Sequence, residues 1–187
     1  MSKTTDLPRN ERSNDLCAYV SGALHFYKTR VVDFGFGYGD MLLCALDNGA
    51  DSIVGFEKDR KVYDIACQKI PVAHQVELFN EDFEKQEELP SADIAFCFSV
   101  LPYLEDPKFF LRVLSHTYDT SVIECQYEGD GPGFLGIKDD FEMRDLLVSC
   151  GFYLPYVIGK TLAKEKYWRT VWLCHMPRAK SNPRDWK

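Results

Sequence analysis

The chain has 187 residues, of which 45% are hydrophobic and 27% charged, and its formal net charge is −7. This length suits one domain with a sizeable core, and the composition is typical of a soluble globular protein. The acidic balance argues against broad nucleic-acid binding, and no apolar run is long enough to cross a membrane. We therefore expect one soluble domain whose partner is neither a membrane nor a nucleic acid.

The cysteines and histidines predict neither a metal centre nor a disulfide framework. The cysteine count is odd, no C-x-x-C pair occurs, and each cysteine lies in an apolar segment: Cys17, Cys44, Cys67, Cys97, Cys125, Cys150 and Cys174. Buried reduced thiols in a cytoplasmic protein are the simplest interpretation. The four histidines occur singly, without the spacing of metal ligands, at His25, His74, His116 and His175.

The sequence predicts a flexible tail at each end of a single domain. Residues 1–12 are polar and are expected to form a flexible tail, and residues 177–187 a flexible basic tail. Helical spacing of apolar residues begins at Asp15 and continues to Tyr27. The domain is therefore expected to span residues 13–176.

The most informative stretch is residues 31–40, VVDFGFGYGD. Val31 to Phe34 predicts a short buried strand, and glycines at every second position then exclude regular structure. A helical pattern follows at once, with Asp40 as its expected cap, and ends near Gly49. Strand, glycine turn and helix together predict the start of a Rossmann-type βαβ unit.

The second strand of this unit ends in an acid at the position where such folds bind a ribose. Ser52 to Phe56 predicts the strand, and Glu57 follows it, about 20 residues beyond the first glycine. A dinucleotide fingerprint needs G-x-G-x-x-G, which this sequence lacks. Asp40 would also place a carboxylate where a pyrophosphate should sit. A ligand with a ribose and no phosphate fits better than a nicotinamide or flavin dinucleotide.

Alternation of strands and helices continues through the rest of the chain. Asp59 and Asp106 are expected to cap helices, with Pro107 opening the second of them, and a further helix starts at Asp139–Asp140. Three further strands are predicted at Gln75–Phe79, Asp93–Phe98 and Ser121–Cys125. Leu154–Thr161 and Trp168–Met176 are joined by a short link and form an antiparallel hairpin. The pattern predicts an α/β domain whose mostly parallel sheet ends in a hairpin.

These features resemble the class I S-adenosylmethionine-dependent methyltransferases from Leu16 to Met176. The run Asp33-x-Gly35-x-Gly37-x-Gly39 resembles the first motif of the family, and Glu57 its second. Residues 99–104, SVLPYL, resemble the fourth motif of the small-molecule branch. The resemblance implies a three-layer αβα Rossmann-like fold with a seven-stranded sheet, and S-adenosyl-L-methionine as cofactor with S-adenosyl-L-homocysteine as product.

The resemblance also assigns residues to the cofactor. It implies that the glycine turn faces the methionine part, that Glu57 binds the ribose hydroxyls, that Asp82 and Phe83 adjoin the adenine, and that backbone near Phe98 and Ser99 holds the amino acid end. A solvated turn is the alternative for Asp82 and Phe83, and anchoring of the glycine loop through backbone N–H groups is a second role for Asp33. The full implied set is Asp33, Gly35, Phe36, Gly37, Gly39, Glu57, Lys58, Asp82, Phe83, Phe98 and Ser99.

Methyl transfer is an in-line displacement in which alignment supplies much of the acceleration, so a catalytic base is optional. Glu124 is the first candidate for a base, because an acid in an apolar strand gains proton affinity from desolvation. Tyr103 is the second. Their structural alternatives are a carboxylate held by backbone or a basic partner, and an aromatic ring used for packing.

The acceptor is predicted to be a small molecule, but its charge stays open. Glu128 and Asp130 would favour a cation, whereas Lys160, Lys164, Lys166 and Arg169 would favour an anion. The alternative functions are an aminopropyltransferase using the decarboxylated cofactor, a non-catalytic nucleotide-binding scaffold, and methylation of a protein or RNA. Nothing in the sequence indicates an oligomeric state.

Overall fold

Seven strands form one sheet in the order β3-β2-β1-β4-β5-β7-β6. The computed structural model describes residues 11–71, 73, 75–127, 136–163 and 167–176. Pairing is parallel from β3 to β5, whereas β7 runs antiparallel to both β5 and β6. The predicted mostly parallel sheet with a terminal hairpin is confirmed. The strands are β1 (Arg30–Phe34), β2 (Ser52–Phe56), β3 (Val76–Phe79), β4 (Ile94–Phe98), β5 (Thr120–Gln126), β6 (Tyr153–Ala163) and β7 (Tyr167–His175).

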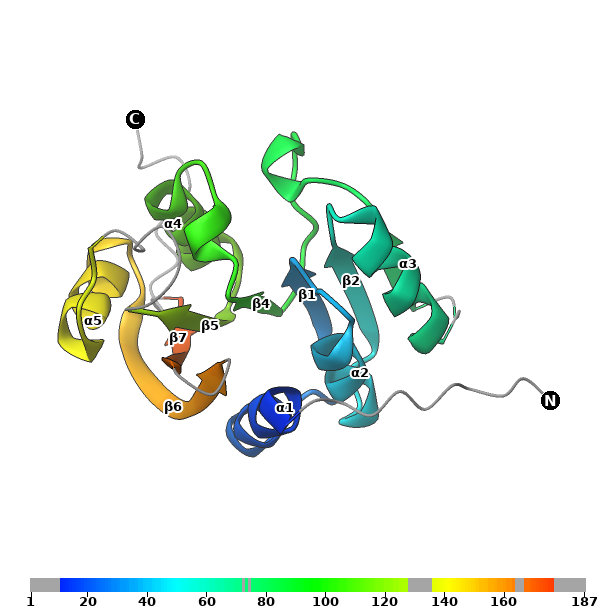
Figure 1. Ribbon diagram of the computed structural model, residues 1–187, viewed down its shortest axis with the longest axis horizontal. Helices are drawn as coiled ribbons and strands as arrows, with labels where there is room; N and C mark the ends of the chain where they lie inside the picture. Colours follow the sequence, from blue (N-terminus) through cyan, green and yellow to red (C-terminus); the bar gives the residue numbers. More distant parts are fainter. Residues whose placement is uncertain (1–10, 72, 74, 128–135, 164–166, 177–187) are drawn as a thin grey trace.

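Helices cover both faces of this sheet and complete the three predicted layers (Figure 1). Buried residues of α1, α2 and α3 form one core cluster with Val31, whereas those of α4 and α5 form a second with Val32. Successive strand residues point to opposite faces, so β1 contributes to both cores. The α-helices are α1 (Glu11–Ala23), α2 (Asp40–Asp47), α3 (Arg60–Lys69), α4 (Pro107–Thr117) and α5 (Asp140–Ser149), and the 3-10 helices are η1 (Phe83–Lys85) and η2 (Leu101–Tyr103).

The predicted caps of α3 and α4 and the predicted start of α5 are confirmed, and the predicted cap of α2 is wrong. Asp59, Asp106 and Asp139 each accept hydrogen bonds from backbone N–H groups at the start of α3, α4 and α5. Gly39, not Asp40, precedes α2, and Asp40 is its first helical residue. The Asp40 carboxylate instead accepts hydrogen bonds from Ser13 and Lys69, at 2.8 and 2.7 Å.

The first helix begins and ends four residues earlier than its apolar spacing predicts. Its described part starts at Glu11, inside the expected tail, and Ser13 in its first turn is buried and bonded to Asp40. It ends at Ala23, and Lys28 then adopts a positive φ of 61°, which a helix does not allow. The remaining residues of both expected tails, 1–10 and 177–187, lie outside the described residues.

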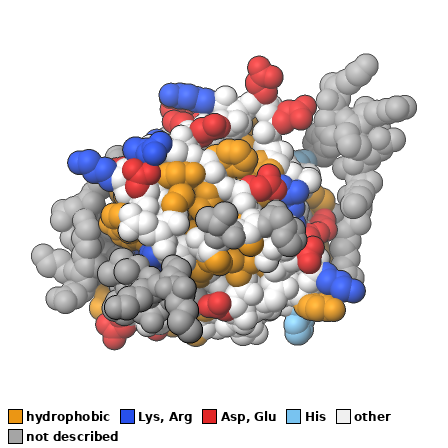
Figure 2. Space-filling view, turned by 90° about the vertical axis from the view of Figure 1, so that its right-hand side faces the viewer, with side chains coloured by type: hydrophobic (Ala, Val, Ile, Leu, Met, Phe, Trp, Pro, Cys, Tyr) orange, Lys and Arg blue, Asp and Glu red, His pale blue; other side chains and the backbone are white. Residues whose placement is uncertain are grey.

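Figure 2 shows the side of the molecule that carries α3. Lysine and arginine side chains lie there among aspartate and glutamate side chains, around a more hydrophobic centre. The described part of this face therefore presents charge of mixed sign. Among the described residues, no helix is long and apolar enough to cross a membrane.

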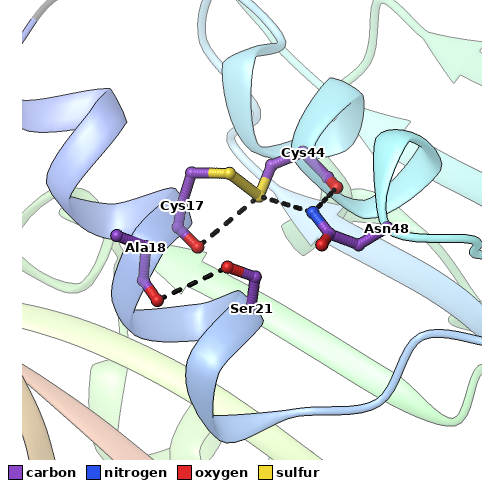
Figure 3. The surroundings of a disulfide bond; sticks show 5 residues. All are labelled: Cys17, Ala18, Ser21, Cys44 and Asn48. Carbon is purple, nitrogen blue, oxygen red and sulfur yellow. Dashed lines mark hydrogen bonds between the residues drawn. A yellow bond between two sulfur atoms is a disulfide. The ribbon is translucent and has the colours of Figure 1, made fainter.

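A disulfide joins the first two helices and corrects the prediction of reduced cysteines. Cys17 of α1 and Cys44 of α2 are bonded, with their Cα atoms 5.8 Å apart (Figure 3). Asn48 donates to the Cys44 carbonyl at 2.8 Å beside it. Sequence spacing hid this pair because helix packing, and not a short loop, brings the two residues together. The other five cysteines are free: Cys67, Cys97, Cys125, Cys150 and Cys174.

Candidate functional site

A cavity of about 220 Å³ lies at the carboxyl ends of β1, β2 and β4, the edge where open α/β sheets bind ligands. Most of the predicted cofactor residues line it, and so does the catalytic candidate Tyr103, although Asp33, Phe36, Gly37 and Gly39 do not. The sequence therefore identified residues that the fold gathers at one place. The lining residues are Gly35, Phe56, Glu57, Lys58, Glu81, Asp82, Phe83, Phe98, Ser99, Val100, Tyr103 and Leu104.

The glycine loop between β1 and α2 combines two packing positions with one open position. All three of its glycines have positive φ, between 56° and 77°. A Cβ atom at Gly35 would lie 2.6 Å from Val100, and one at Gly39 would lie 2.5 Å from Ile70. A Cβ atom at Gly37 would meet no atom within 4 Å. The space over Gly37 therefore allows a ligand to approach the backbone closely.

The carboxylate of Glu57 is oriented by the loop that it faces. The N–H of Gly37 donates to Oε2 at 3.1 Å, and the N–H of Asp59 donates to Oε1 at 2.8 Å. Asn80 also donates to the Glu57 carbonyl, at 2.8 Å. A carboxylate has about four acceptor positions, so this one keeps about two for a ligand in the cavity.

Asp33 is a buried acid with an unsatisfied oxygen. Its Oδ1 has no hydrogen-bond partner among the described residues. Burial and the charge of Glu57 raise the pKa of Asp33 to about 7. Its alternative role as an anchor of the glycine loop finds no support, because the N–H groups of Gly35 and Phe36 bind the Phe56 carbonyl.

Phe83 and Asp82 line the cavity together with Ser99. The ring of Phe83 is buried, with its centroid 5.0 Å from those of Phe34 and Phe110, so the solvated-turn alternative is wrong for this residue. Asp82 caps η1 by accepting from the Glu84 N–H at 3.3 Å.

Lys58 and Phe36 were both assigned to the cofactor, but only the Lys58 side chain lies at the cavity. Lys58 lines the cavity with its Nζ 3.9 Å from Oδ2 of Asp82. Phe36 packs in the core beneath α1, α2 and α3, with its ring 6.1 Å from that of Tyr63. Its side chain therefore belongs to the core and not to the cavity wall.

Glu124, at the end of β5, is fully buried and held by four side chains. Arg12 donates to both carboxylate oxygens, through Nε to Oε1 at 3.0 Å and through Nη2 to Oε2. Ser99 also donates to Oε2, Thr161 donates to Oε1 at 2.5 Å, and Arg169 Nη1 lies 3.8 Å from Oε2. The alternative to a catalytic base was a carboxylate held by a basic partner, and the structure contains such a carboxylate at Glu124.

The predicted rise in the pKa of Glu124 is wrong. Burial raises the pKa, but the hydrogen bonds and charge of Arg12, with hydrogen bonds from Ser99 and Thr161, bring it below its ordinary value. A carboxylate so stabilised in its ionised form has little affinity for a proton.

Sequence reasoning missed Arg12, which fell in the expected tail. It named Arg169 only together with Lys160, Lys164 and Lys166, as a cation that would favour an anionic acceptor, and did not place it beside Glu124. Of the two, only the position of Arg169 could be read from the sequence. Side chains alternate along β7, so Arg169 and Thr170 lie on opposite faces of the sheet. Glu128, Asp130, Lys164 and Lys166, which also bear on the charge of the acceptor, lie outside the described residues.

Tyr103 lies in η2 at the mouth of the cavity, and 70% of its surface is exposed. It is close enough to Arg169 to interact with it electrostatically. In the described part of the chain, no group of three histidine, cysteine or acidic side chains could hold a metal ion.

Residues 32–116 match the family model described as a methyltransferase domain. No curated protein sequence matches the chain. The fold is similar to that of several solved structures at low sequence identity.

One such structure is the magnesium protoporphyrin IX methyltransferase of Synechocystis PCC 6803 with bound SAM, at 18% identity and a TM-score of 0.67, covering 87% of this chain and 77% of that one. A second is the N-terminal domain of EvdMO1 with SAH bound, at 17% identity and a TM-score of 0.69, covering 94% and 85%. A third is a putative RNA methyltransferase from Pyrococcus horikoshii, at 16% identity and a TM-score of 0.63, covering 88% and 82%.

The matched model covers residues 32–116, somewhat less than half of the chain, and shows that this stretch is similar to a methyltransferase domain. The Rossmann-like fold that the sequence predicts is confirmed.

Proposed function

We propose that the protein transfers a methyl group from S-adenosylmethionine to a small molecule in the cavity at the carboxyl edge of the sheet. The supporting observation is the joint placement of Gly35, Glu57, Phe83 and Ser99 around one cavity. Small molecules also appear in the names of two similar structures, a magnesium protoporphyrin IX methyltransferase and EvdMO1 crystallised in the presence of SAH and D-fucose.

The residues present fit the cofactor. In our proposal Glu57 accepts from the ribose hydroxyls with its two remaining acceptor positions, and Phe83, Asp82 and Lys58 adjoin the adenine. The unsatisfied Oδ1 of Asp33 provides an acceptor beside the glycine loop for the amino acid end. The open space over Gly37 leaves room for that end to approach the backbone.

When bound, S-adenosylmethionine supplies an electrophilic methyl group on a sulfonium. The residues of the chain then have to align the acceptor and exclude competing geometries, because in-line transfer depends on alignment. Val100 and Leu104 form apolar parts of the cavity wall, and Tyr103 offers a hydroxyl at its mouth. Glu124 acts in this proposal by fixing Arg12 and Arg169, since its own acceptor positions are occupied.

Calorimetric titration tests cofactor choice. S-adenosylhomocysteine should bind and NAD should not, and Glu57→Gln should weaken S-adenosylhomocysteine by about tenfold or more. Glu77→Gln is the matched control, because Glu77 lies on the neighbouring strand β3 and forms an exposed ion pair with Arg30. Preference for NAD, or equal affinity in the wild type and Glu57→Gln, would contradict the proposal.

Incubation of a metabolite extract with cofactor labelled in its methyl group tests the acceptor class. Label should appear in a small product. Label confined to macromolecules would overturn the small-molecule proposal in favour of a protein or RNA acceptor, and no label would favour a scaffold.

The aminopropyltransferase alternative receives less support than methyl transfer. The acidic pocket of that class of enzyme would suit Glu124, Glu128 and Asp130, of which only Glu124 lies among the described residues. The Glu124 carboxylate is instead enclosed by Arg12, Ser99, Thr161 and Arg169, and offers no free negative charge to a cationic acceptor.

We also propose a cytoplasmic location, which the five free cysteines favour and the Cys17–Cys44 disulfide opposes. The Cys17–Cys44 pair provides the test. In a reducing compartment both thiols should be captured when freshly lysed cells are treated with an alkylating agent. Recovery of the bonded pair from such cells would contradict this location.

A further inference from the structure

Two arginines from distant parts of the chain meet at Ser99. Nη2 of Arg12 donates to Oγ of Ser99 at 2.9 Å, and Nη1 of Arg169 donates to the same oxygen at 2.7 Å. Ser99 lines the cavity. Helix α1 and strand β7 therefore each direct a guanidinium group to the hydroxyl of a residue in the cavity wall.

The positive charge of this pair is balanced only in part. Glu124 is the one acid that forms an ion pair with either arginine among the described residues, and it carries one negative charge against two positive ones. Burial lowers the pKa of Arg169, Glu124 raises it, and the charge of Arg12 lowers it, with a net decrease. The two cations thus repel each other despite the acid beside them.

Each guanidinium also keeps a donor group for a ligand. Arg12 uses Nε and Nη2, and Arg169 uses Nη1 for Ser99 and Nε for Gln126, at 3.3 Å. Nη1 of Arg12 and Nη2 of Arg169 bond to no described residue. The side chains are 27% and 19% exposed, so a small molecule can reach them. A planar array of such donors matches a carboxylate or phosphate.

The position of the pair separates it from the ribose end of the cavity. Glu57 directly follows β2 and Glu124 lies near the end of β5, with β1 and β4 between the two strands. Three strand spacings correspond to roughly 14 Å along this edge of the sheet. The arginines therefore lie about three strands away from the residue proposed to bind the ribose.

We propose that Arg12 and Arg169 bind an anionic group, a carboxylate or a phosphate, of the methyl acceptor. This inference rests on the proposed function, because it takes the cavity to be the cofactor site. Glu124 is then a positioning residue that holds both guanidinium groups at Ser99. A cationic acceptor is disfavoured beside these arginines by the surplus positive charge.

Titration of the full chain with anions tests the site without knowledge of the acceptor. Inorganic phosphate and benzoate are added to protein saturated with S-adenosylhomocysteine, at constant ionic strength set with chloride, and the arginine Nε–H signals are followed by NMR. The signals of Arg12 and Arg169 should shift saturably with phosphate or benzoate. No saturable shift with either probe would overturn the proposal.

Variants assign the response to the pair. Arg169→Gln should weaken the anion response of Arg12 by about tenfold or more. This variant should fold, because Glu124 retains Arg12, Ser99 and Thr161. Arg169→Lys, which keeps the charge and loses the planar fork, gives a second measurement. Arg112→Gln on the exposed side of α4 is the matched control and should respond like the wild type. An unchanged response in Arg169→Gln would overturn the proposal.

The carboxylate of the cofactor itself is the competing source of the anion. We therefore compare binding of S-adenosylhomocysteine with that of 5′-methylthioadenosine, which lacks the amino acid part. In Arg169→Gln both affinities should stay within about twofold of the wild type. Loss of S-adenosylhomocysteine affinity alone would assign the arginines to the cofactor and overturn the proposal. Failure of the proposed function is distinguishable, since S-adenosylhomocysteine would then not bind the wild type, while the anion titration can be repeated without it.

Discussion

Arg12 donates through Nε to Oε1 of Glu124 at 3.0 Å, joining the first helix to the fifth strand across 112 positions of the sequence. The contact brings a cation from the start of the domain to the carboxyl edge of its sheet. Helix α1 is therefore part of the site as well as a cover for the core (Figure 1). The ionised state of Glu124 depends on this contact.

We expect Glu124→Gln to lower the free energy of unfolding by about 3 kcal/mol, because an amide cannot neutralise the two arginines. Since the pKa of Glu124 is lowered, its stabilisation is complete above the unfolded value of 4.5 and is lost as the pH falls through the folded value. Urea denaturation at several pH values measures both effects. Turnover per folded molecule should fall by less than about tenfold.

The same variant can contradict this assignment. If Glu124 is a general base, turnover should fall by about 10²–10⁴-fold, with loss of the limb that reports its deprotonation. The stability of such a variant would be close to that of the wild type. Glu77→Gln is the control, since its exposed partner Arg30 should make it nearly neutral.

The sequence predicted those parts of the site that are local in the chain. The glycine loop and Glu57 belong to one βαβ unit, and a Gly37 N–H bonds to the Glu57 carboxylate as that unit implies. The Arg12, Glu124 and Arg169 cluster joins three elements far apart in sequence, so no spacing identifies it. The Cys17–Cys44 bond escaped prediction for the same reason. The start of α1 was misplaced because its first turn is fixed by a tertiary contact from Ser13 to Asp40.

Asp33→Asn should make the protein more stable at pH 8 and weaken its binding of S-adenosylhomocysteine. The pKa of Asp33 is about 7 in the folded protein against 3.8 when unfolded, so the folded state binds the proton more tightly. Wild-type stability should therefore fall as the pH rises from about 4 to 7, by about 4 kcal/mol in total, and stay level above that range. The variant should lack this fall and be the more stable protein at pH 8.

Affinity for S-adenosylhomocysteine should fall by about tenfold in Asp33→Asn, because the amide removes the negative charge beside the glycine loop. Thermal unfolding across pH, together with calorimetry, checks the two halves of the prediction. Asp119→Asn, which removes an exposed carboxylate, should show neither effect. A wild type whose stability does not change between pH 4 and 7 relative to Asp33→Asn would disprove the raised pKa.

The double variant Cys17→Ser, Cys44→Ser should lower the free energy of unfolding. The bond closes a segment with a sequence separation of 27, for which loop-closure entropy predicts a loss of about 3.5 kcal/mol. Calorimetry with and without a reductant checks this. The reductant should lower the melting temperature of the wild type and leave that of the double variant unchanged, and Cys67→Ser should behave as the wild type does. Equal melting temperatures for the oxidised wild type and the double variant would contradict a structural role.

Gly37→Ala separates the effect of a side chain on cofactor binding from its effect on the folding of the glycine loop. Gly37 has a φ of 56° and open space where a Cβ would lie, so alanine should cost only the strain of a left-handed backbone, about 1–2 kcal/mol. The added methyl would occupy the space proposed for the cofactor, and affinity for S-adenosylhomocysteine should fall by about tenfold or more. Gly136→Ala is a matched control, because Gly136 has a φ of 69° and likewise no atom within 4 Å of a built Cβ, yet lies outside the glycine loop that joins β1 to α2. The control should show the same strain with unchanged affinity, whereas unchanged affinity in Gly37→Ala would remove this glycine from the cofactor site.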